Sequence, residues 1–291
     1  MKKILCLLGI ASLFTLTGCS DAHADISTGD KAIITVGDKK ITNKDVYNTT
    51  KKSYGSSLVL NRVMTLICDN EKIELDDAMK KQADEQVATF KTQAGEAFTA
   101  QLETYGYKDE EEFKKGDIYP ALRQNALVKK YVTSKQKDMF ATYKPVQATI
   151  LEAGSKENAT AALSAIKEGM SFSDAVTKYG VSDSYKGENA TYVTKSGLPT
   201  ALFDKMSTEK KNGLVDSVIE DTTNKKFYVV DITNNDPTKF EEEAITTIVT
   251  KGGTEVQTVA NAYYLKKYEF KIYDKDIYDG IKSTNASYII Q

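Results

Sequence analysis

Cysteine and histidine carry the most distinctive side-chain chemistry, and both are scarce in this sequence. The 291 residues include three cysteines and one histidine, and Cys19 and His23 stand four positions apart. On a helix this spacing could direct both side chains at one metal ion. A zinc site takes three or four protein ligands, and two ligands on a short polar segment are too few. The sequence therefore predicts no metal site and no cofactor.

The single histidine also limits the chemistry of the rest of the chain. Residues 24–291 contain none, so a domain folded from them cannot use a Ser-His-Asp triad or a Cys-His pair. Histidine-based general acid and base steps are excluded as well. Cys68 lies in the apolar stretch VLNRVMTLICDN, which predicts a buried, inert thiol rather than a nucleophile.

The N-terminal residues have the pattern of a secretory signal. Lys2 and Lys3 precede an apolar run from Ile4 to Leu16, which is shorter than the roughly 20 residues that span a bilayer. The run ends in LTGC, which resembles a bacterial lipoprotein signal. That resemblance implies a signal peptide over residues 1–18 and a diacylglycerol on Cys19, with palmitate-type acyl chains anchoring the protein to the outer face of the bacterial cell membrane. Residues 19–30 are small and polar and predict a tether.

Composition excludes a nucleic-acid partner. The chain has 39 basic and 41 acidic residues and a formal net charge of -2. Loss of Lys2 and Lys3 with the signal would change this charge to about -4, and the two signs are interspersed. No basic face of the kind that binds nucleic acid is predicted.

Residues 31–143 predict a hairpin followed by helices. AIITVGDKKI alternates around Gly37-Asp38, and Thr42 is placed to cap the next helix. Periodic apolar residues then predict helices over about 57–69, 75–94, 96–105, 109–115 and 118–142.

Residues 144–237 have a different character. Pro145 and Pro237 bracket this segment. Within it, VQATILEA predicts a strand, three helices follow, and GLVDSVIE and KKFYVVDIT predict a hairpin. Residues 238–291 return to helix. The fold class is therefore predicted as α+β, with a discontinuous, mostly helical lobe of residues 31–143 and 238–291 and an α+β domain inserted at 144–237.

The inserted segment resembles a parvulin-type peptidyl-prolyl isomerase. Gly169, Phe172, Ala175 and Tyr179 in KEGMSFSDAVTKYG match the second helical element of that family, and GLVDSV matches the approach to its final hairpin. The outer segments, such as FKTQAGEAFTAQLETYGYKDEEEFKK and YEFKIYDKDIYDGI, resemble SurA-type and PrsA-type chaperone lobes. Together with the lipoprotein signal, the order of segments resembles a PrsA-type foldase lipoprotein.

The sequence departs from the parvulin family at its two active-site histidines. By alignment, these positions are Thr149 and Tyr228 in this chain. Because no histidine replaces them, we expect no efficient prolyl isomerisation, and no catalytic residue is predicted. An active isomerase with a histidine-independent site is the alternative hypothesis.

The resemblance implies a chaperone or foldase that assists unfolded or partly folded exported proteins. Such a protein binds exposed apolar segments weakly and keeps them from aggregating. By alignment to the family's pocket, the candidate client-binding residues are Leu198, Phe203, Met206 and Tyr228; the alternative is that they pack a short helix on its sheet. Whether the lobe forms a homodimer is left open by the sequence.

Overall fold

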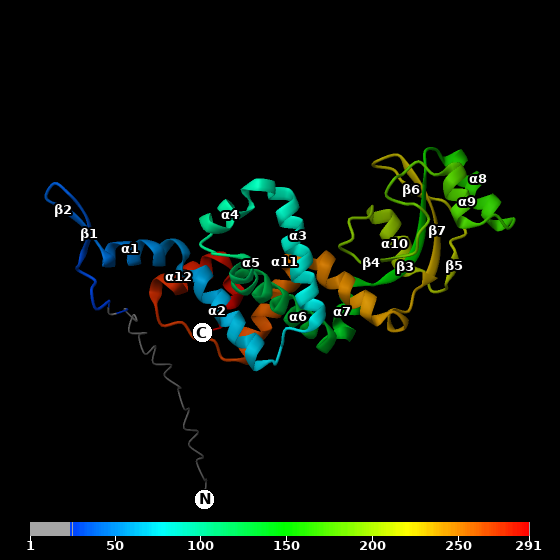
Figure 1. Ribbon diagram of the computed structural model, residues 1–291. Helices are drawn as coiled ribbons and strands as arrows, with labels where there is room; N and C mark the ends of the chain where they lie inside the picture. The colour runs from blue at the N-terminus through cyan, green and yellow to red at the C-terminus, as the bar shows by residue number, and fades with distance from the viewer. Residues whose placement is uncertain (1–23, 25, 291) are drawn as a thin grey trace, which may run out of the picture. The chain divides into compact units, whose positions relative to one another are not determined.

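The computed structural model describes residues 24 and 26–290 (Figure 1). The predicted signal peptide, Cys19 and His23 lie outside the described residues. The chain forms two compact units. Unit 1 combines the chain up to Arg62 with the chain from Glu269 on, and unit 2 runs from Val63 to Tyr268.

Unit 1 begins with the predicted hairpin. Strand β1 (Ala32–Val36) pairs antiparallel with β2 (Lys39–Thr42), and the turn places Gly37 at φ +58°, a conformation that favours glycine. Helix α1 (Asn43–Thr50) follows at once. The Thr42 hydroxyl accepts from the backbone of Asp45, whose carboxylate accepts from the Thr42 backbone. This reciprocal capping box confirms the predicted cap.

Unit 1 is completed by a π-helical turn (Lys51–Gly55), the start of α2 (Ser56–Asn70) and helix α12 (Lys275–Thr284). Gly55 packs closely against α12, because a Cβ atom there would lie 2.6 Å from Ile277 Cδ1 and would displace that side chain. The Lys51 ammonium lies 2.9 Å from a carboxylate oxygen of both Asp274 and Asp276. These ion pairs raise the lysine pKa and join the two chain segments.

The helices of unit 2 include the rest of α2. The others are α3 (Asp77–Ala94), α4 (Phe98–Thr104), α5 (Glu110–Phe113), α6 (Tyr119–Ser134), α7 (Gln136–Tyr143), α8 (Lys156–Lys167), α9 (Phe172–Tyr179), α10 (Thr200–Thr208) and α11 (Glu241–Lys267). A π-helical turn (Lys114–Ile118) joins α5 to α6.

One helix differs from its predicted extent, and another contains a predicted break. The single helix predicted over 118–142 is wrong, because Lys135 leaves helical geometry (φ -115°, ψ 22°) and separates α6 from α7. The two helical stretches predicted after Pro237 form α11, whose helical geometry is interrupted at Gly253 (φ +49°, ψ -128°). That conformation is accessible almost only to glycine.

The inserted segment forms a five-stranded antiparallel sheet. Its strands are β3 (Val146–Ala153), β4 (Ala190–Tyr192), β5 (Gly213–Leu214), β6 (Ile219–Asp221) and β7 (Lys226–Asn234). Strand β3 lies between β4 and β7, and both β5 and β6 pair with β7. GLVDSVIE thus supplies two short strands instead of one, and β4 was not predicted. The α+β class is confirmed.

Helices cover both faces of this sheet (Figure 1). Ala148 and Ile150 of β3 pack with Tyr228 and Val230 of β7 and with α10 in one buried cluster, which we call the α10-side cluster. Leu151 and Ala153 pack with α8 and α9 in another. Alternation along β3 therefore divides the segment into two cores, one on each face.

Hydrogen bonds tie the sheet to α11. The Glu243 carboxylate accepts from the Gln147 amide and, at 3.3 Å, from the Thr191 hydroxyl. Further along the helix, the Glu255 carboxylate lies 2.8 Å from the Lys195 ammonium and 3.3 Å from the Tyr143 hydroxyl. The inserted segment and the helices beside it therefore form part of the same unit.

The two units do not share the predicted domain boundaries. Residues 144–237 and most of the surrounding helices belong to unit 2, and the division falls within α2 and after Tyr268. The division at 143/144 and 237/238 stays a prediction about domain organisation. Among the described residues, no helix combines the length and apolar character that crossing a bilayer requires.

Candidate functional site

The two positions aligned with the parvulin histidines lie on opposite faces of the sheet. Tyr228 packs in the α10-side cluster. Thr149 stands between Ala148 and Ile150 of that cluster, and its cross-strand partner is Asp231. Because successive strand residues point to opposite faces, Thr149 is directed at the α8 and α9 side. The structure therefore does not bring these two residues together.

The four candidate client-binding residues do come together. Phe203, Met206 and Tyr228 belong to the buried α10-side cluster, and Leu198 packs against it from its edge. Their exposure differs, however. Tyr228 is 1% exposed, Met206 is not exposed and Phe203 is 7% exposed, whereas Leu198 is half-buried. In this structure the first three contact the protein's own core, and only Leu198 reaches the surface.

A carboxylate and an aromatic ring that the sequence reasoning missed adjoin Tyr228. Glu152 is its cross-strand partner, is 6% exposed and lies 2.8 Å from the Lys226 ammonium. The Tyr185 ring meets the Tyr228 ring edge to face, with centroids 6.0 Å apart. Two features of the sequence could have identified these residues. Glu152 is the single acid in the apolar strand VQATILEA, and Tyr185 is the single aromatic residue in the polar loop SDSYKGEN.

The electrostatics around Tyr228 keep its hydroxyl protonated. Burial raises the pKa of the Tyr228 hydroxyl, and the nearby Glu152 carboxylate raises it further. Burial raises the pKa of Tyr185 as well. The Lys226 pKa is raised by its ion pair with Glu152. The neutral phenol of Tyr228 can donate a hydrogen bond but is not a base near pH 7.

A shallow hollow of about 500 Å³ adjoins this cluster at the surface. Residues 197–201, leading into α10, and residues 221–224, of the β6–β7 turn, line it. The buried Asp221 carboxylate accepts from the Asn224 amide at 2.7 Å and from the backbone of Thr223 and Asn224. The Asn224 side chain holds the Asp221 pKa below its ordinary value. This acid is therefore fully engaged in shaping the turn.

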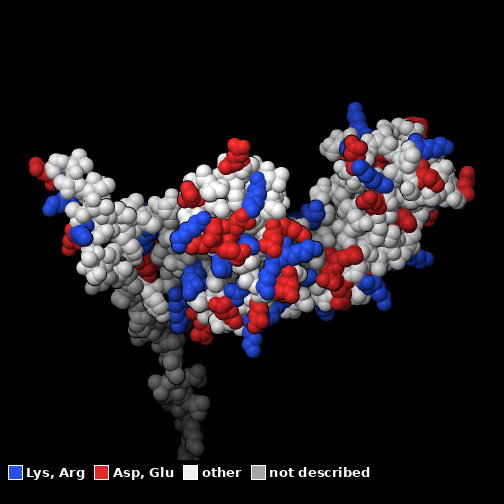
Figure 2. All heavy atoms as spheres, viewed as in Figure 1, with Lys and Arg blue, Asp and Glu red and all other residues white. Residues whose placement is uncertain are grey.

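A second group of side chains stands out by exposure. Eleven of the sixteen strongly exposed large apolar side chains in the described part of the chain lie in unit 1, the smaller unit. Nine of them fall between residues 33 and 59: Ile33, Ile34, Val36, Ile41, Val46, Tyr47, Tyr54, Leu58 and Val59. We call these nine the N-terminal apolar set. Figure 2 shows largely uncharged atoms over β1, β2 and α1, with charged groups of both signs along the edge.

Exposure of this kind is unusual for a hairpin. All five residues of β1 are exposed, so neither face of the two-stranded sheet is covered within unit 1. Isolated two-stranded hairpins are marginally stable in water, and contiguous exposed apolar patches generally mark sites of protein association. The N-terminal apolar set is therefore the surface of the described chain best suited to contact another polypeptide.

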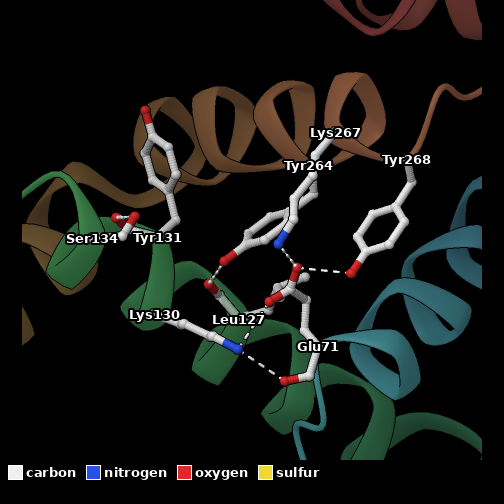
Figure 3. Close-up of polar contacts among 8 residues, drawn as sticks. All are labelled: Glu71, Leu127, Lys130, Tyr131, Ser134, Tyr264, Lys267 and Tyr268. Carbon is white, nitrogen blue, oxygen red and sulfur yellow. Dashed lines mark hydrogen bonds and ion pairs between the residues drawn. The ribbon is translucent and has the colours of Figure 1, made fainter.

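A third group, shown in Figure 3, is charged and buried among the helices. The Glu71 side chain is 6% exposed and ion-paired with Lys267 and, at 2.9 Å, with Lys130. Burial would raise the pKa of this carboxyl, but hydrogen bonds from Lys130, Lys267 and Tyr268 outweigh it and lower the pKa to about 2. A permanently ionised, fully paired acid stabilises packing and is not available for acid–base chemistry.

Among the described residues there is no group of three or more histidine, cysteine or acidic side chains that could hold a metal ion. Burial raises the pKa of Cys68 to about 11. The thiol therefore stays protonated near pH 7 and is a poor nucleophile.

Comparison with curated proteins gives relatives that are named foldase protein PrsA. No family model matches the chain. Foldase protein PrsA 2 of Bacillus cereus is 25% identical over 289 residues, covering 96% of this chain and 95% of the relative. Foldase protein PrsA of Exiguobacterium sibiricum is 24% identical over 299 residues, covering 96% and 93%.

A solved structure has a similar fold. The crystal structure of foldase protein PrsA from Streptococcus pneumoniae covers 89% of this chain and 100% of its own, with a TM-score of 0.51 and 20% identity. The sequence matches extend over both units, so they include the outer helices as well as the inserted sheet. Sequence similarity to the PrsA-type foldases extends along nearly the whole length of the chain.

Proposed function

We propose that this protein is an extracytoplasmic chaperone of the foldase type that binds unfolded or partly folded exported proteins. Lipid on Cys19 would hold it at the outer face of the cell membrane, with residues 19–30 as a tether. The proposed activity is holding clients, with no efficient prolyl isomerisation. The observation that carries the proposal is the N-terminal apolar set, whose exposed side chains match the apolar segments that unfolded proteins present.

The sheet segment supports the non-catalytic part of this proposal. The described chain has no histidine, and Thr149 and Tyr228 occupy opposite faces of the sheet. Side chains on opposite faces of a packed sheet cannot both reach one bound peptide bond. Catalysis must lower a barrier of about 18–20 kcal/mol, and the raised pKa of Tyr228 keeps its phenol protonated near pH 7, so it supplies no base there.

A client-binding role for Leu198, Phe203, Met206 and Tyr228 stays a prediction. Three of these side chains are buried, so direct contact with a client would require α10 or the loop that covers the cluster to move. Leu198 is the one that a client could reach in this structure.

The test uses the chain from Ser20 on, which retains every residue that the structure describes. Citrate synthase is heated with increasing amounts of the protein, and light scattering measures its aggregation. We expect suppression at stoichiometric amounts. The triple variant V36S/Y54S/L58S removes side chains that are 70%, 65% and 60% exposed, and we expect it to need several-fold more protein for equal suppression.

The matched control is Y105S/V181S, which removes apolar side chains that are 65% and 60% exposed in unit 2. It should suppress aggregation as well as the unmodified chain. Sedimentation velocity on each protein checks whether the same surface instead joins two copies. Loss of a dimer in the triple variant, with undiminished suppression, would assign the N-terminal apolar set to a homodimer interface and contradict its assignment to clients.

A further inference from the structure

The loop between α9 and β4 places one aromatic ring over the α10-side cluster. Residues 181–189 form no helix or strand, and their side chains are polar except for Val181 and Tyr185. Tyr185 is half-buried and packs against the cluster. Its ring meets that of Tyr228 at 88°, an arrangement typical of favourable aromatic pairs.

The loop is held firmly at its ends. The Val181 backbone donates to the Glu152 carbonyl at 3.0 Å, and the Asn189 side chain accepts from the Thr233 hydroxyl at 2.6 Å. Between these anchors, the Ser184 backbone bonds only to the Ser182 hydroxyl within the loop itself. Packing of Tyr185 on the α10-side cluster connects the middle of the loop to the sheet, and Gly187 lies close to Ser173 and Val176 of α9.

The surface beneath the ring is suited to an aromatic guest. Tyr228 forms its floor, and Phe203 and Met206 belong to the same cluster. Methionine and aromatic side chains adapt to varied apolar partners. Leu198, at the edge of the cluster and of the surface hollow, would extend this surface once the ring moved away.

We propose that Tyr185 is an internal occupant of a pocket over Tyr228, and that residues 182–188 swing outward to admit an aromatic side chain of an extended client segment. This inference rests on the proposed chaperone function and specifies a second client-binding site, in unit 2. The client ring takes the place of the Tyr185 ring, so one aromatic pair replaces another.

Such an exchange makes binding weak and reversible. When a pocket is open only a small fraction of the time, the apparent affinity for its ligand falls by that fraction. A site closed by its own side chain therefore hides an apolar surface when no client is present and still admits one at high local concentration. Removing the internal ring should strengthen client binding, the opposite of what loss of a contact residue would do.

The experiment compares Tyr185→Ala with the unmodified chain from Ser20 on. The probe is a fluorescein-labelled ten-residue peptide of glycine and serine with one central phenylalanine, and a matched peptide carries alanine there. We expect Y185A to bind the phenylalanine peptide about tenfold more tightly, with no gain for the alanine peptide. Lys186→Ala shortens the adjacent exposed side chain of the same loop and should behave as the unmodified chain.

The binding site of the peptide is located by crosslinking, with a photo-reactive diazirine placed next to the phenylalanine of the peptide. We expect crosslinks to Leu198, Phe203 or Tyr228 in Y185A, and fainter crosslinks to the same residues in the unmodified chain at high peptide concentration. Hydrogen exchange on the unmodified chain with saturating peptide should show faster exchange across residues 182–188, a result that does not depend on how the variant folds.

Unchanged affinity in a folded Y185A protein, or crosslinks confined to unit 1, would overturn the proposal. The aggregation assay separates the two hypotheses. If the unmodified chain suppresses aggregation but Y185A binds the peptide no more tightly, the chaperone function is supported and the pocket is contradicted. If Y185A binds the peptide more tightly but the unmodified chain does not suppress aggregation, the pocket is supported and the chaperone function is contradicted.

Discussion

The hydroxyl of Tyr268 donates a 2.8 Å hydrogen bond to the carboxylate of Glu71, 197 residues earlier in the chain. The bond joins the residue that follows α2 to the residue that follows α11. Lys130 of α6 completes the arrangement at 2.9 Å. Three helices thus meet at one buried charge.

Replacing this carboxylate should destabilise unit 2. Glu71→Gln keeps the side-chain shape but loses the ion pairs with Lys130 and Lys267. Both lysines are about half exposed, so water can solvate them, and we expect a loss of about 2 kcal/mol in the free energy of unfolding. Urea denaturation monitored by circular dichroism measures it. Glu74→Gln, at an exposed position three residues on, should stay within about 0.5 kcal/mol of the unmodified chain.

The same carboxylate predicts an acid dependence of stability. The Glu71 pKa falls from an ordinary value of 4.5 to about 2 on folding. A lowered pKa stabilises the folded state above the unfolded pKa, and this contribution is lost as the pH falls from about 5 to about 2. It is on the order of 3 kcal/mol in total. The stability difference between the unmodified chain and E71Q should therefore shrink over this range; a constant difference would contradict the assignment.

Backbone strain at the interruption of α11 gives another prediction. Gly253→Ala places a Cβ atom on a residue with φ +49° and ψ -128°, which should cost about 1–3 kcal/mol. Thermal unfolding measures the effect. Thr254→Ala, at the exposed next position, should leave stability unchanged or slightly raised because alanine favours helix. An unaffected G253A protein would mean that α11 can straighten at no cost.

Isomerase activity should be absent at useful rates. We expect the slow, proline-limited phase of refolding of reduced and carboxymethylated ribonuclease T1 to keep its rate at micromolar concentrations of the protein. The physical reason is the lack of a paired catalytic network on either face of the sheet. Acceleration that survives in E152Q but disappears when the α10-side cluster is altered, for instance by Leu198→Ala, would support the alternative hypothesis of a histidine-independent isomerase.

Lipid attachment is tested at Cys19. Cells that express the full chain with radiolabelled palmitate should incorporate label into the protein, and Cys19→Ala should abolish incorporation and release the protein from the membrane fraction. The matched variant Cys68→Ala, which changes a buried thiol, should keep the label. Labelled C19A protein would contradict the assignment of the lipid to this residue.

Local sequence signals predicted the parts of the fold that depend on local physics. Gly37-Asp38 predicted the hairpin, and Thr42 predicted the start of α1, because turn and cap chemistry lie within a few residues. The break at Lys135 could not be predicted, since neither glycine nor proline marks it. Strand β4 has three residues and owes its existence to pairing with β3.

The candidate site shows the same limit. The absence of histidine from residues 24–291 follows from the sequence alone, but the opposite orientation of Thr149 and Tyr228 depends on the pairing of β3 with β7, which a single sequence does not reveal. The burial of Phe203 and Met206 follows from how α10 docks on the sheet. Exposure of the N-terminal apolar set was equally hidden, because an alternating hairpin usually predicts one covered face.

The way the inserted segment joins the helices bears on how such a protein can evolve. Gln147 and Asn234, near the two ends of the segment, are cross-strand partners in adjacent strands, so the chain departs from the helices and returns to them at nearly the same place. Changes within such a segment leave the connections of the helices intact. An ancestral catalytic module could thus lose its reactive side chains, or be exchanged for another module, while selection continued to act on the helices alone.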